Sequence, residues 1–169
     1  MQGVLYAGLM LTASGPKVLE FNARFGDPEA QVVLPILDAD LLMLLDAVAQ
    51  GTLAEIAPPP PPARAAVGVV LASGGYPGPY QTGVPISGLD RVPEDVLVFH
   101  AGTRRAGDGR ILTAGGRVLT VVGLGPDLAS ARERAYAGVE VITFEGAHWR
   151  RDIALREVAP HATLASDPR

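Results

Sequence analysis

The segment from Glu20 to Glu29 holds side chains whose types and spacing suit metal and anion chemistry. It reads Glu-Phe-Asn-Ala-Arg-Phe-Gly-Asp-Pro-Glu. In a strand, alternation would place Glu20 and Asn22 on one face and Phe21 on the other. Two adjacent hard oxygen donors are what Mg²⁺ needs from a protein when water and nucleotide phosphates complete its shell. The spacing predicts a metal site, although a surface strand with an ion-pair turn would show the same pattern.

A permanently charged donor follows this pair. Arg24 carries a fork-shaped guanidinium that suits an anion close to Glu20 and Asn22. A structural ion pair with Asp27 or Glu29 is the alternative. The segment therefore combines two oxygen ligands with one fixed cation.

A hairpin and a short helix are predicted to position these side chains. Residues 3–11 and 17–22 read as antiparallel strands joined by the polar, Gly- and Pro-bearing residues 12–16. Pro28 suits the first turn of a helix over residues 28–37, with Asp27 near its positive end. The chemistry is thus expected where the chain leaves the second strand.

A second helix is indicated by the spacing of Leu41, Leu44, Leu45 and Val48. Asp38 or Asp40 could cap its start, and Gly51 could end it. Its high Leu and Met content favours burial on all sides over a partner-binding face.

Five consecutive prolines, Pro58 to Pro62, predict a stiff spacer between two domains. A ligand for an aromatic-lined groove is the alternative for this run. We expect an α+β fold divided into residues 1–57, the 58–62 linker, a small mostly antiparallel domain at 63–158 and a polar tail at 159–169.

The small domain is predicted from apolar runs and turn signals. Its expected strands are residues 65–72, 96–103, 110–114 and 116–124, with turns at Gly74-Gly75, Gly107-Asp108-Gly109 and Gly115-Gly116. A helix capped by Asp127 would bury the stripe of Leu128, Ala131, Ala135, Val139 and Ile142, and would turn Arg132, Glu133 and Arg134 toward water.

Composition restricts the class of protein. The chain has 169 residues, a formal net charge of −4 and no cysteine. The charge argues against a nucleic-acid-binding module, and the missing cysteines exclude disulfides and thiolate chemistry. No apolar run approaches the roughly 18 residues of a membrane span. We therefore expect a soluble cytoplasmic protein without nucleic-acid or membrane partners.

Six phrases in sequence order resemble the glycinamide ribonucleotide synthetase family, the phosphoribosylamine–glycine ligases of purine biosynthesis. They are Gly3–Met10, Lys17–Glu29, Gly74–Gly78, Phe99–Thr103, Gly115–Leu119 and Arg151–Ile153. Members of this family are longer, and an amino-terminal domain, a Gly-rich ATP lid and an adenine-binding segment precede the region that resembles this chain. The resemblance implies the carboxy-terminal end of an ATP-grasp domain followed by a small α+β domain, with the missing amino-terminal part as a partner.

The resemblance also implies a reaction and roles for residues. Glycine would be joined to 5-phosphoribosylamine as ATP is cleaved to ADP and phosphate. Glu20 and Asn22 match the metal-ligand positions and would hold Mg²⁺ or Mn²⁺. Arg24 would steady charge on the transferring phosphoryl group or the acyl phosphate, and Asp27 would orient an amine substrate or place Arg24, with a helix cap as the structural alternative. Glu29 could face solvent.

In the small domain, Arg117 is the residue we expect at the ribose 5-phosphate, because Gly115 and Gly116 leave backbone amides for an anion. Arg104, Arg105 and Arg110 are expected to form a solvated face. The Gly74–Gly78 loop suits either close approach to a ligand or a tight connection between strands. His100 is expected in the core, and His148 with Trp149 is expected to pack down the last segment.

One departure from related enzymes concerns the metal. Many ATP-grasp enzymes carry a third acidic ligand on the preceding strand, where this chain has Tyr6-Ala7-Gly8 and no carboxylate before Glu20. The metal site in this chain is therefore expected to be incomplete. Because the nucleotide lid and most adenine contacts implied by the resemblance are also absent, we expect little or no ligase activity from the chain alone. Another ATP-grasp carboxylate–amine ligase, a carboxylase-type relative and a non-catalytic binding module remain alternatives.

Overall fold

The computed structural model describes residues 2–158, which divide between Ala63 and Arg64 into two compact units, named unit 1 and unit 2. Residues 57–62, which include the proline run, form neither helix nor strand and lie just before the division. The predicted tail at 159–169 lies outside the described residues. No helix within residues 2–158 is both long and apolar enough to cross a lipid bilayer.

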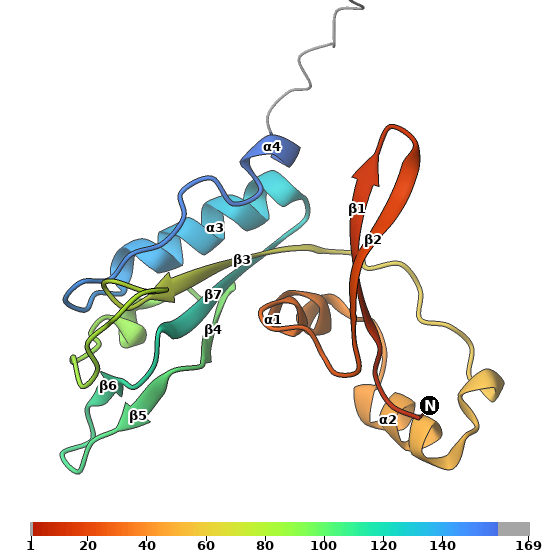
Figure 1. Ribbon diagram of the computed structural model, residues 1–169, viewed down its shortest axis with the longest axis horizontal. Coiled ribbons are helices and arrows are strands. Elements are labelled where there is room, and N and C mark those ends of the chain that lie inside the picture. Colours follow the sequence, from red (N-terminus) through yellow and green to blue (C-terminus); the bar gives the residue numbers. More distant parts are fainter. Residues whose placement is uncertain (1, 159–169) are drawn as a thin grey trace, which may run out of the picture. The chain divides into compact units, whose positions relative to one another are not determined.

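Unit 1 consists of a β-hairpin followed by short helices (Figure 1). Its elements are β1 (Tyr6–Thr12), β2 (Gly15–Asn22), α1 (Glu29–Val33), η1 (Leu34–Ile36), α2 (Leu41–Gln50) and η2 (Leu53–Glu55). The strands are antiparallel, as predicted. The single helix predicted over 28–37 is wrong, because a 3₁₀ turn containing Pro35 replaces its second half. Proline has no N–H to continue the α-helical ladder.

Helix α2 forms with the predicted ends but without the predicted burial. Asp40 is its cap, accepting a 3.1 Å hydrogen bond from the Met43 amide, and Gly51 ends the helix with a φ of 77°. Ala47 is buried, whereas the Leu42 side chain is 76% exposed. An apolar composition favours burial, but a side chain is buried only where another surface packs against it. Within the described residues of unit 1, no such surface covers Leu42.

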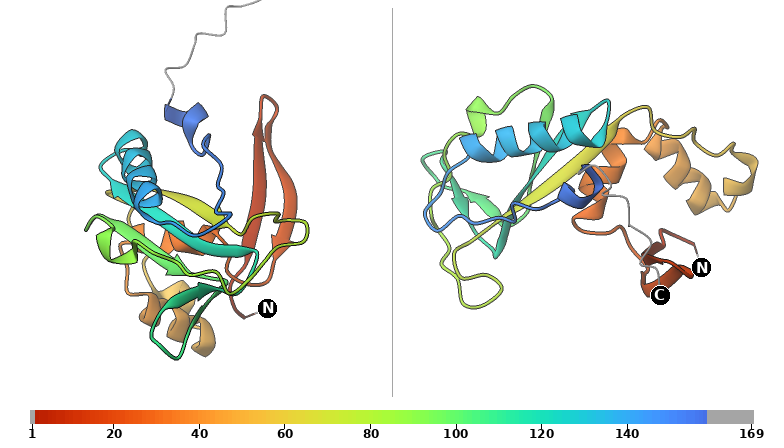
Figure 2. Two further views of the ribbon diagram at one scale, coloured as in Figure 1. Left: turned by 90° about the vertical axis from the view of Figure 1, so that its left-hand side faces the viewer. Right: turned by 90° about the horizontal axis from the view of Figure 1, so that it is seen from above.

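Unit 2 is a three-stranded antiparallel sheet with one helix across a face (Figures 1 and 2). The sheet order is β3 (Ala65–Ala72), β7 (Arg117–Gly125), β4 (Val96–His100), and the covering helix is α3 (Leu128–Val141). A separate pair is formed by β5 (Thr103–Arg105) and β6 (Ile111–Thr113), and the remaining elements are η3 (Leu89–Arg91) and α4 (Leu155–Val158). Together with unit 1, these elements confirm the α+β class with antiparallel sheets.

The strand predicted over 96–103 is interrupted. β4 ends at His100 and β5 begins at Thr103. Between them, a Cβ added at Gly102 would lie 2.6 Å from the Arg117 carbonyl oxygen and 2.7 Å from the Gly115 Cα. The backbone therefore leaves the sheet where it passes closely over the segment that starts β7.

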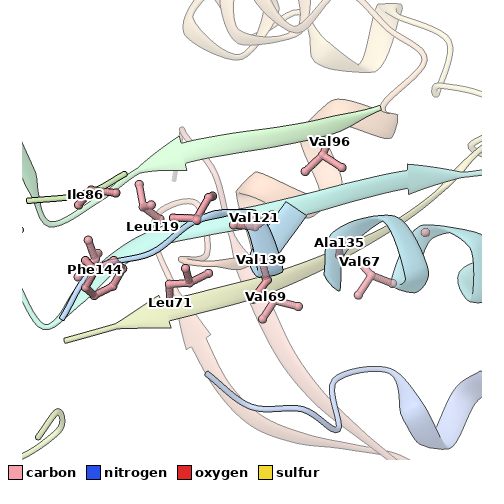
Figure 3. Packing of buried hydrophobic residues seen from close by; sticks show 13 residues of the cluster. Val67, Val69, Leu71, Ile86, Val96, Leu119, Val121, Ala135, Val139 and Phe144 are labelled. Atoms are coloured by element: carbon pink, nitrogen blue, oxygen red, sulfur yellow. The ribbon is translucent and has the colours of Figure 1, made fainter. Parts of the chain in front are cut away.

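The core of unit 2 lies between the sheet and α3 (Figure 3). Val69, Leu71 and Val121 from the strands are fully buried, as are Ala135 and Val139 from the helix. β7 is the central strand, which explains why its side chains from Val118 to Val122 are all buried. Burial of branched side chains on this scale stabilises the sheet–helix pair by a few kcal/mol per large residue.

The predicted face of α3 needs corrections at three residues. Leu128 is 41% exposed, so the buried stripe begins at Ala131. Arg134 is not simply solvated, because it contacts Asp95 at 3.1 Å and donates to the Leu124 carbonyl at 2.7 Å. Arg132 lies over the Tyr136 ring and donates to the Ile153 carbonyl at 2.9 Å.

These contacts give the two arginines a structural role. Their long side chains reach back from α3 to the ends of neighbouring segments, which sequence periodicity does not reveal.

Candidate functional site

The hairpin of unit 1 places the predicted metal ligands on one face. Glu20 lies opposite Gly8 and Asn22 lies opposite Tyr6, so all four residues share a face of the two-stranded sheet. A Cβ at Gly8 would lie 3.2 Å from the Glu20 Cγ, which shows that the Glu20 side chain lies across this glycine. A side chain at position 8 would crowd the Glu20 side chain, so Gly8 leaves it room.

Arg24 folds back onto this face. Its Nη2 donates to the Asn22 Oδ1 at 3.4 Å, and its Nη1 donates to the Phe25 carbonyl at 2.8 Å. The Arg24 guanidinium thus contacts the Asn22 amide oxygen, which the sequence spacing predicts to be a metal ligand. The guanidinium and this predicted ligand oxygen lie together at the end of β2.

Tyr6 joins the same cluster and was missed by sequence reasoning. Its hydroxyl lies close enough to the Glu29 carboxylate for that group to affect its pKa. Burial raises the pKa of the Tyr6 hydroxyl above its usual value, and the charges of Glu29 and then Glu20 raise it further. The signal that could have found Tyr6 is the hairpin register, which sets it opposite Asn22.

The turn before α1 fixes the remaining acidic side chains. A Cβ at Gly26 would meet the Glu29 carboxylate, so Glu29 packs against the turn. Asp27 Oδ1 accepts a 2.9 Å hydrogen bond from Gln31 Nε2. The N-cap position of α1 belongs to Pro28 and has no side-chain cap, so the helix-cap alternative for Asp27 is wrong. Pro28 interposes one residue between Asp27 and the helix, which removes it from the capping position.

The donor set at β2 fits a hard divalent cation. A carboxylate and an amide oxygen lie on one face, and the Glu20 side chain is exposed. No group of three or more His, Asp or Glu side chains within residues 2–158 gathers as a metal cluster. A cation held at Glu20 and Asn22 would take its other ligands from water and phosphate, which is usual for Mg²⁺.

In unit 2, the Gly115-Gly116-Arg117 segment is held by its neighbours. The Ser73 hydroxyl donates to the Gly115 carbonyl and the Ser73 amide donates to the Gly116 carbonyl, both at 2.8 Å. The Gly102 amide donates to the Arg117 carbonyl at 2.9 Å. The backbone that presents the exposed Arg117 side chain is therefore rigidly placed.

Two tyrosines cover this segment from the Gly74–Gly78 side. A Cβ at Gly116 would overlap the Tyr76 ring and would lie 3.0 Å from the Tyr80 Cε1. The two rings meet edge to face with centroids 6.1 Å apart. The glycine-rich loop thus reaches the segment that carries Arg117.

Two other arginines of the predicted cluster, Arg105 and Arg110, contact the turn at residues 107–109. Arg110 donates to Asp108 through its backbone amide at 3.1 Å and its Nε at 2.7 Å. The backbone amide, followed by the guanidinium, lowers the pKa of the Asp108 carboxyl below its usual value. Arg105 donates to the Gly109 carbonyl at 3.3 Å, while Arg104 is exposed on β5.

His100 and His148 differ in how they match the expectations from sequence. His100 is exposed at the end of edge strand β4, with Nδ1 3.0 Å from the Thr103 Oγ1, so its assignment to the core is wrong. An edge strand end has no neighbour to cover it. His148 is exposed but exchanges backbone hydrogen bonds with Ala72, and Trp149 packs against the core, so the last segment is indeed packed down.

Comparison with known proteins identifies the family. Residues 66–156 match the model of the phosphoribosylglycinamide synthetase C domain, and residues 1–30 match that of its ATP-grasp (A) domain. The chain belongs to the phosphoribosylglycinamide synthetase family. This confirms the resemblance to its carboxy-terminal portion, including the order of the two domains.

Members of the phosphoribosylglycinamide synthetase family from distant organisms are similar over nearly the whole chain. The phosphoribosylamine–glycine ligase of Caulobacter vibrioides is 52% identical over 155 residues, which cover 91% of this chain and 36% of that protein. The trifunctional purine biosynthetic protein adenosine-3 of Gallus gallus is 52% identical over 158 residues, covering 93% of this chain and 16% of that protein.

A solved structure agrees with the fold. The crystal structure of the phosphoribosylamine–glycine ligase of Thermotoga maritima is 39% identical, with a TM-score of 0.75. The match covers 89% of this chain and 36% of that one. The chain therefore has the fold of this part of the family. It spans 36% of the length of the Caulobacter vibrioides ligase and of the Thermotoga maritima chain.

Proposed function

We propose that this chain forms the carboxy-terminal part of a phosphoribosylamine–glycine ligase, which joins glycine to 5-phosphoribosylamine in the cytoplasm while ATP is cleaved to ADP and phosphate. The observation that carries the proposal is the match to both family domains, at residues 1–30 and 66–156. The Glu20, Asn22 and Arg24 cluster at the end of β2 supports it.

The reaction needs an activated carboxyl group, because an amine does not displace oxide from a carboxylate. Transfer of the ATP γ-phosphoryl group to the glycine carboxylate forms glycyl phosphate and releases ADP. The amine of phosphoribosylamine then attacks the glycyl carbonyl carbon, phosphate leaves with the C–O bond pair, and the amine loses a proton. Such transfers depend mainly on positioning and on neutralising charge.

The side chains of unit 1 suit the phosphoryl-transfer half. Glu20 and Asn22 would hold Mg²⁺ or Mn²⁺, which supplies positive charge to the nucleotide phosphates when bound. Arg24, already at the Asn22 oxygen, would donate to the transferring phosphoryl group or to the acyl phosphate. Asp27, on the turn held by Gln31, would orient the amine.

The side chains of unit 2 suit the phosphate of the amine substrate. Arg117 would pair with the ribose 5-phosphate. Gly115 and Gly116 would contribute through their backbone, since the Tyr76 ring and Gly102 pack where their side chains would be. The hydrogen bonds from Ser73 keep this segment in place before the ligand arrives.

The test measures ADP release with ATP, Mg²⁺, glycine and freshly generated phosphoribosylamine. Because the chain spans 36% of the Caulobacter vibrioides ligase, we expect little ADP from the chain alone. We expect activity when the preceding part of that ligase is added as a separate polypeptide. If the mixture released no ADP although both polypeptides were folded, the result would count against the ligase assignment.

Two controls separate the alternatives. Glu20→Ala with Asn22→Ala in the active mixture should abolish ADP release, and surviving activity would favour a binding module. Replacement of glycine by bicarbonate or formate should also abolish it, and activity with either would indicate a different ATP-grasp ligase.

A further inference from the structure

A pocket of about 450 Å³ in unit 2 has no role in the function proposed so far. It is lined by Gly74, Pro79, Tyr80, Gln81, Glu145 and Gly146. Its volume is within the range of small-molecule sites, which runs from roughly 300 to 1,000 Å³. Its lining combines an aromatic ring, a side-chain amide and a carboxylate.

The pocket wall depends on two glycines in close contact. A Cβ at Gly74 would lie 3.0 Å from the Gly146 carbonyl oxygen, and Gly146 itself has a φ of 72°. Side chains at these positions would push the two backbones apart. The closeness of the two segments is thus built into the sequence.

The pocket adjoins the segment proposed to hold phosphate. Tyr80 lines the pocket, and its Cε1 would lie 3.0 Å from a Cβ at Gly116. Ser73, directly before Gly74, donates to the carbonyls of Gly115 and Gly116. One short segment, residues 73–80, therefore contacts both the pocket and the start of β7.

The lining suits a polyol rather than an apolar ligand. An aromatic face such as that of Tyr80 packs against the C–H face of a sugar ring. The Glu145 carboxylate accepts hydrogen bonds from hydroxyl groups, and the Gln81 amide both donates and accepts them. Both residues are exposed and therefore accessible to a ligand.

We infer that this pocket binds the pentose ring of a sugar phosphate whose phosphate group lies at Gly115–Arg117. The inference rests on the proposed function, because it places the rest of the amine substrate beside the predicted phosphate contact. It adds Glu145, Gln81 and Tyr80 as contacts to the ring.

The test is titration of the isotopically labelled chain with stable probes, followed by NMR of backbone amides. Ribose 5-phosphate should shift the signals of Gly74, Gln81 and Gly146 together with that of Gly116. Inorganic phosphate should shift Gly116 and leave the three pocket signals in place. Shifts from ribose 5-phosphate confined to the phosphate segment would overturn the inference and leave the phosphate proposal intact.

Variants show which contacts supply affinity. Glu145→Gln should lower the affinity for ribose 5-phosphate by about tenfold, the loss expected for a charged hydrogen bond. It should leave the affinity for inorganic phosphate unchanged. Arg117→Ala should lower the affinity for both ribose 5-phosphate and inorganic phosphate. Glu133→Gln, an exposed site on α3 with the same change of charge, is the matched control.

Two further outcomes are decisive. Equal ribose 5-phosphate affinities for Glu145→Gln and Glu133→Gln would overturn the role of Glu145. If ribose 5-phosphate still shifts the pocket signals of Arg117→Ala with unchanged affinity, the result would support ring binding in the pocket and refute the phosphate contact at Arg117.

Discussion

At the scale of single residues, Asn22 has two partners competing for one oxygen. Its Oδ1 is the proposed metal ligand, yet it accepts a hydrogen bond from Arg24 at 3.4 Å. Typical N–H···O hydrogen bonds are about 2.7–3.2 Å long, so this one is weak and easily displaced. A guanidinium beside a ligand oxygen also repels an arriving cation. Arg24 therefore opposes free metal and favours a metal that arrives with phosphate charge.

We predict that Arg24→Ala strengthens binding of free Mn²⁺ to this chain by a few-fold. Unit like charges about 4 Å apart repel by about 1 kcal/mol in bulk water, and salt reduces this. The measurement is free Mn²⁺ by electron paramagnetic resonance at low ionic strength. Lys17→Ala removes the same charge elsewhere on β2 and should have a smaller effect. Equal or weaker binding by Arg24→Ala would show that Arg24 does not compete.

At the scale of elements, α3 lies close to the sheet because the facing strand contains glycine. A Cβ at Gly123 in β7 would overlap the Ala131 carbonyl oxygen and the Ala135 amide nitrogen. On the helix side, small residues and the fully buried Val139 fill the interface. The central strand β7 and α3 are thus packed in direct contact.

We predict that Gly123→Ala destabilises unit 2 by about 1–3 kcal/mol or more, because overpacking forces the helix away from the sheet. Urea unfolding followed by the fluorescence of Trp149, the only tryptophan, measures this. Gly107→Ala is the matched control, since a Cβ there meets no atom within 4 Å. Similar unfolding midpoints for the two variants would contradict the proposed close packing.

The start of α3 should give unit 2 a pH-dependent stability. Asp127 Oδ1 accepts from the Ser130 amide at 2.7 Å, and this backbone hydrogen bond is the main cause that lowers the pKa of the Asp127 carboxyl below 3.8. A lowered carboxyl pKa stabilises the fold above the unfolded value of 3.8. That contribution is lost as pH falls through the folded value.

We therefore predict that Asp127→Ala lowers the urea midpoint of unit 2 at pH 7, and that the difference shrinks in acid. Asp127→Asn should keep most of the capping but lose its acid dependence, because an amide does not titrate there. Urea midpoints at neutral and strongly acidic pH test both statements. An Asp127→Ala effect of equal size at both pH values would refute the charge contribution.

At the scale of the whole molecule, the two units differ in how completely they bury their apolar side chains. Unit 2 has a continuous core, whereas several apolar side chains of the unit 1 hairpin are exposed. Examples are Leu11 at 81%, Leu19 at 65% and Phe21 at 61%. Exposed apolar side chains on a two-stranded sheet favour association with another surface.

We predict that the chain alone self-associates through this hairpin as its concentration rises. Light scattering should show an average mass that increases with concentration and falls after Leu11→Lys with Phe21→Lys. Leu155→Lys, an exposed position in α4 of unit 2, should leave the association unchanged. A constant monomer mass at high concentration would contradict this prediction.

The sequence by itself was sufficient for the features that depend on local order. Strand alternation predicted the shared face of Glu20 and Asn22. The sequence predicted Asp127 as a helix cap and left the other cap between Asp38 and Asp40, of which the structure has Asp40. The order of motifs was also sufficient for the family, which the matches to both domains confirmed. These features depend on backbone geometry and neighbouring residues, which a linear sequence states directly.

Only the tertiary structure revealed what depends on which surfaces meet. It placed Tyr6 beside Glu29, turned Arg24 onto Asn22 and set the tyrosine-bearing loop against Gly116. It also showed that α2 is largely exposed and that Arg134 is tied to Asp95. The physical reason is that burial and side-chain partners depend on residues far apart in the chain, and periodicity within one element cannot specify the surface opposite it.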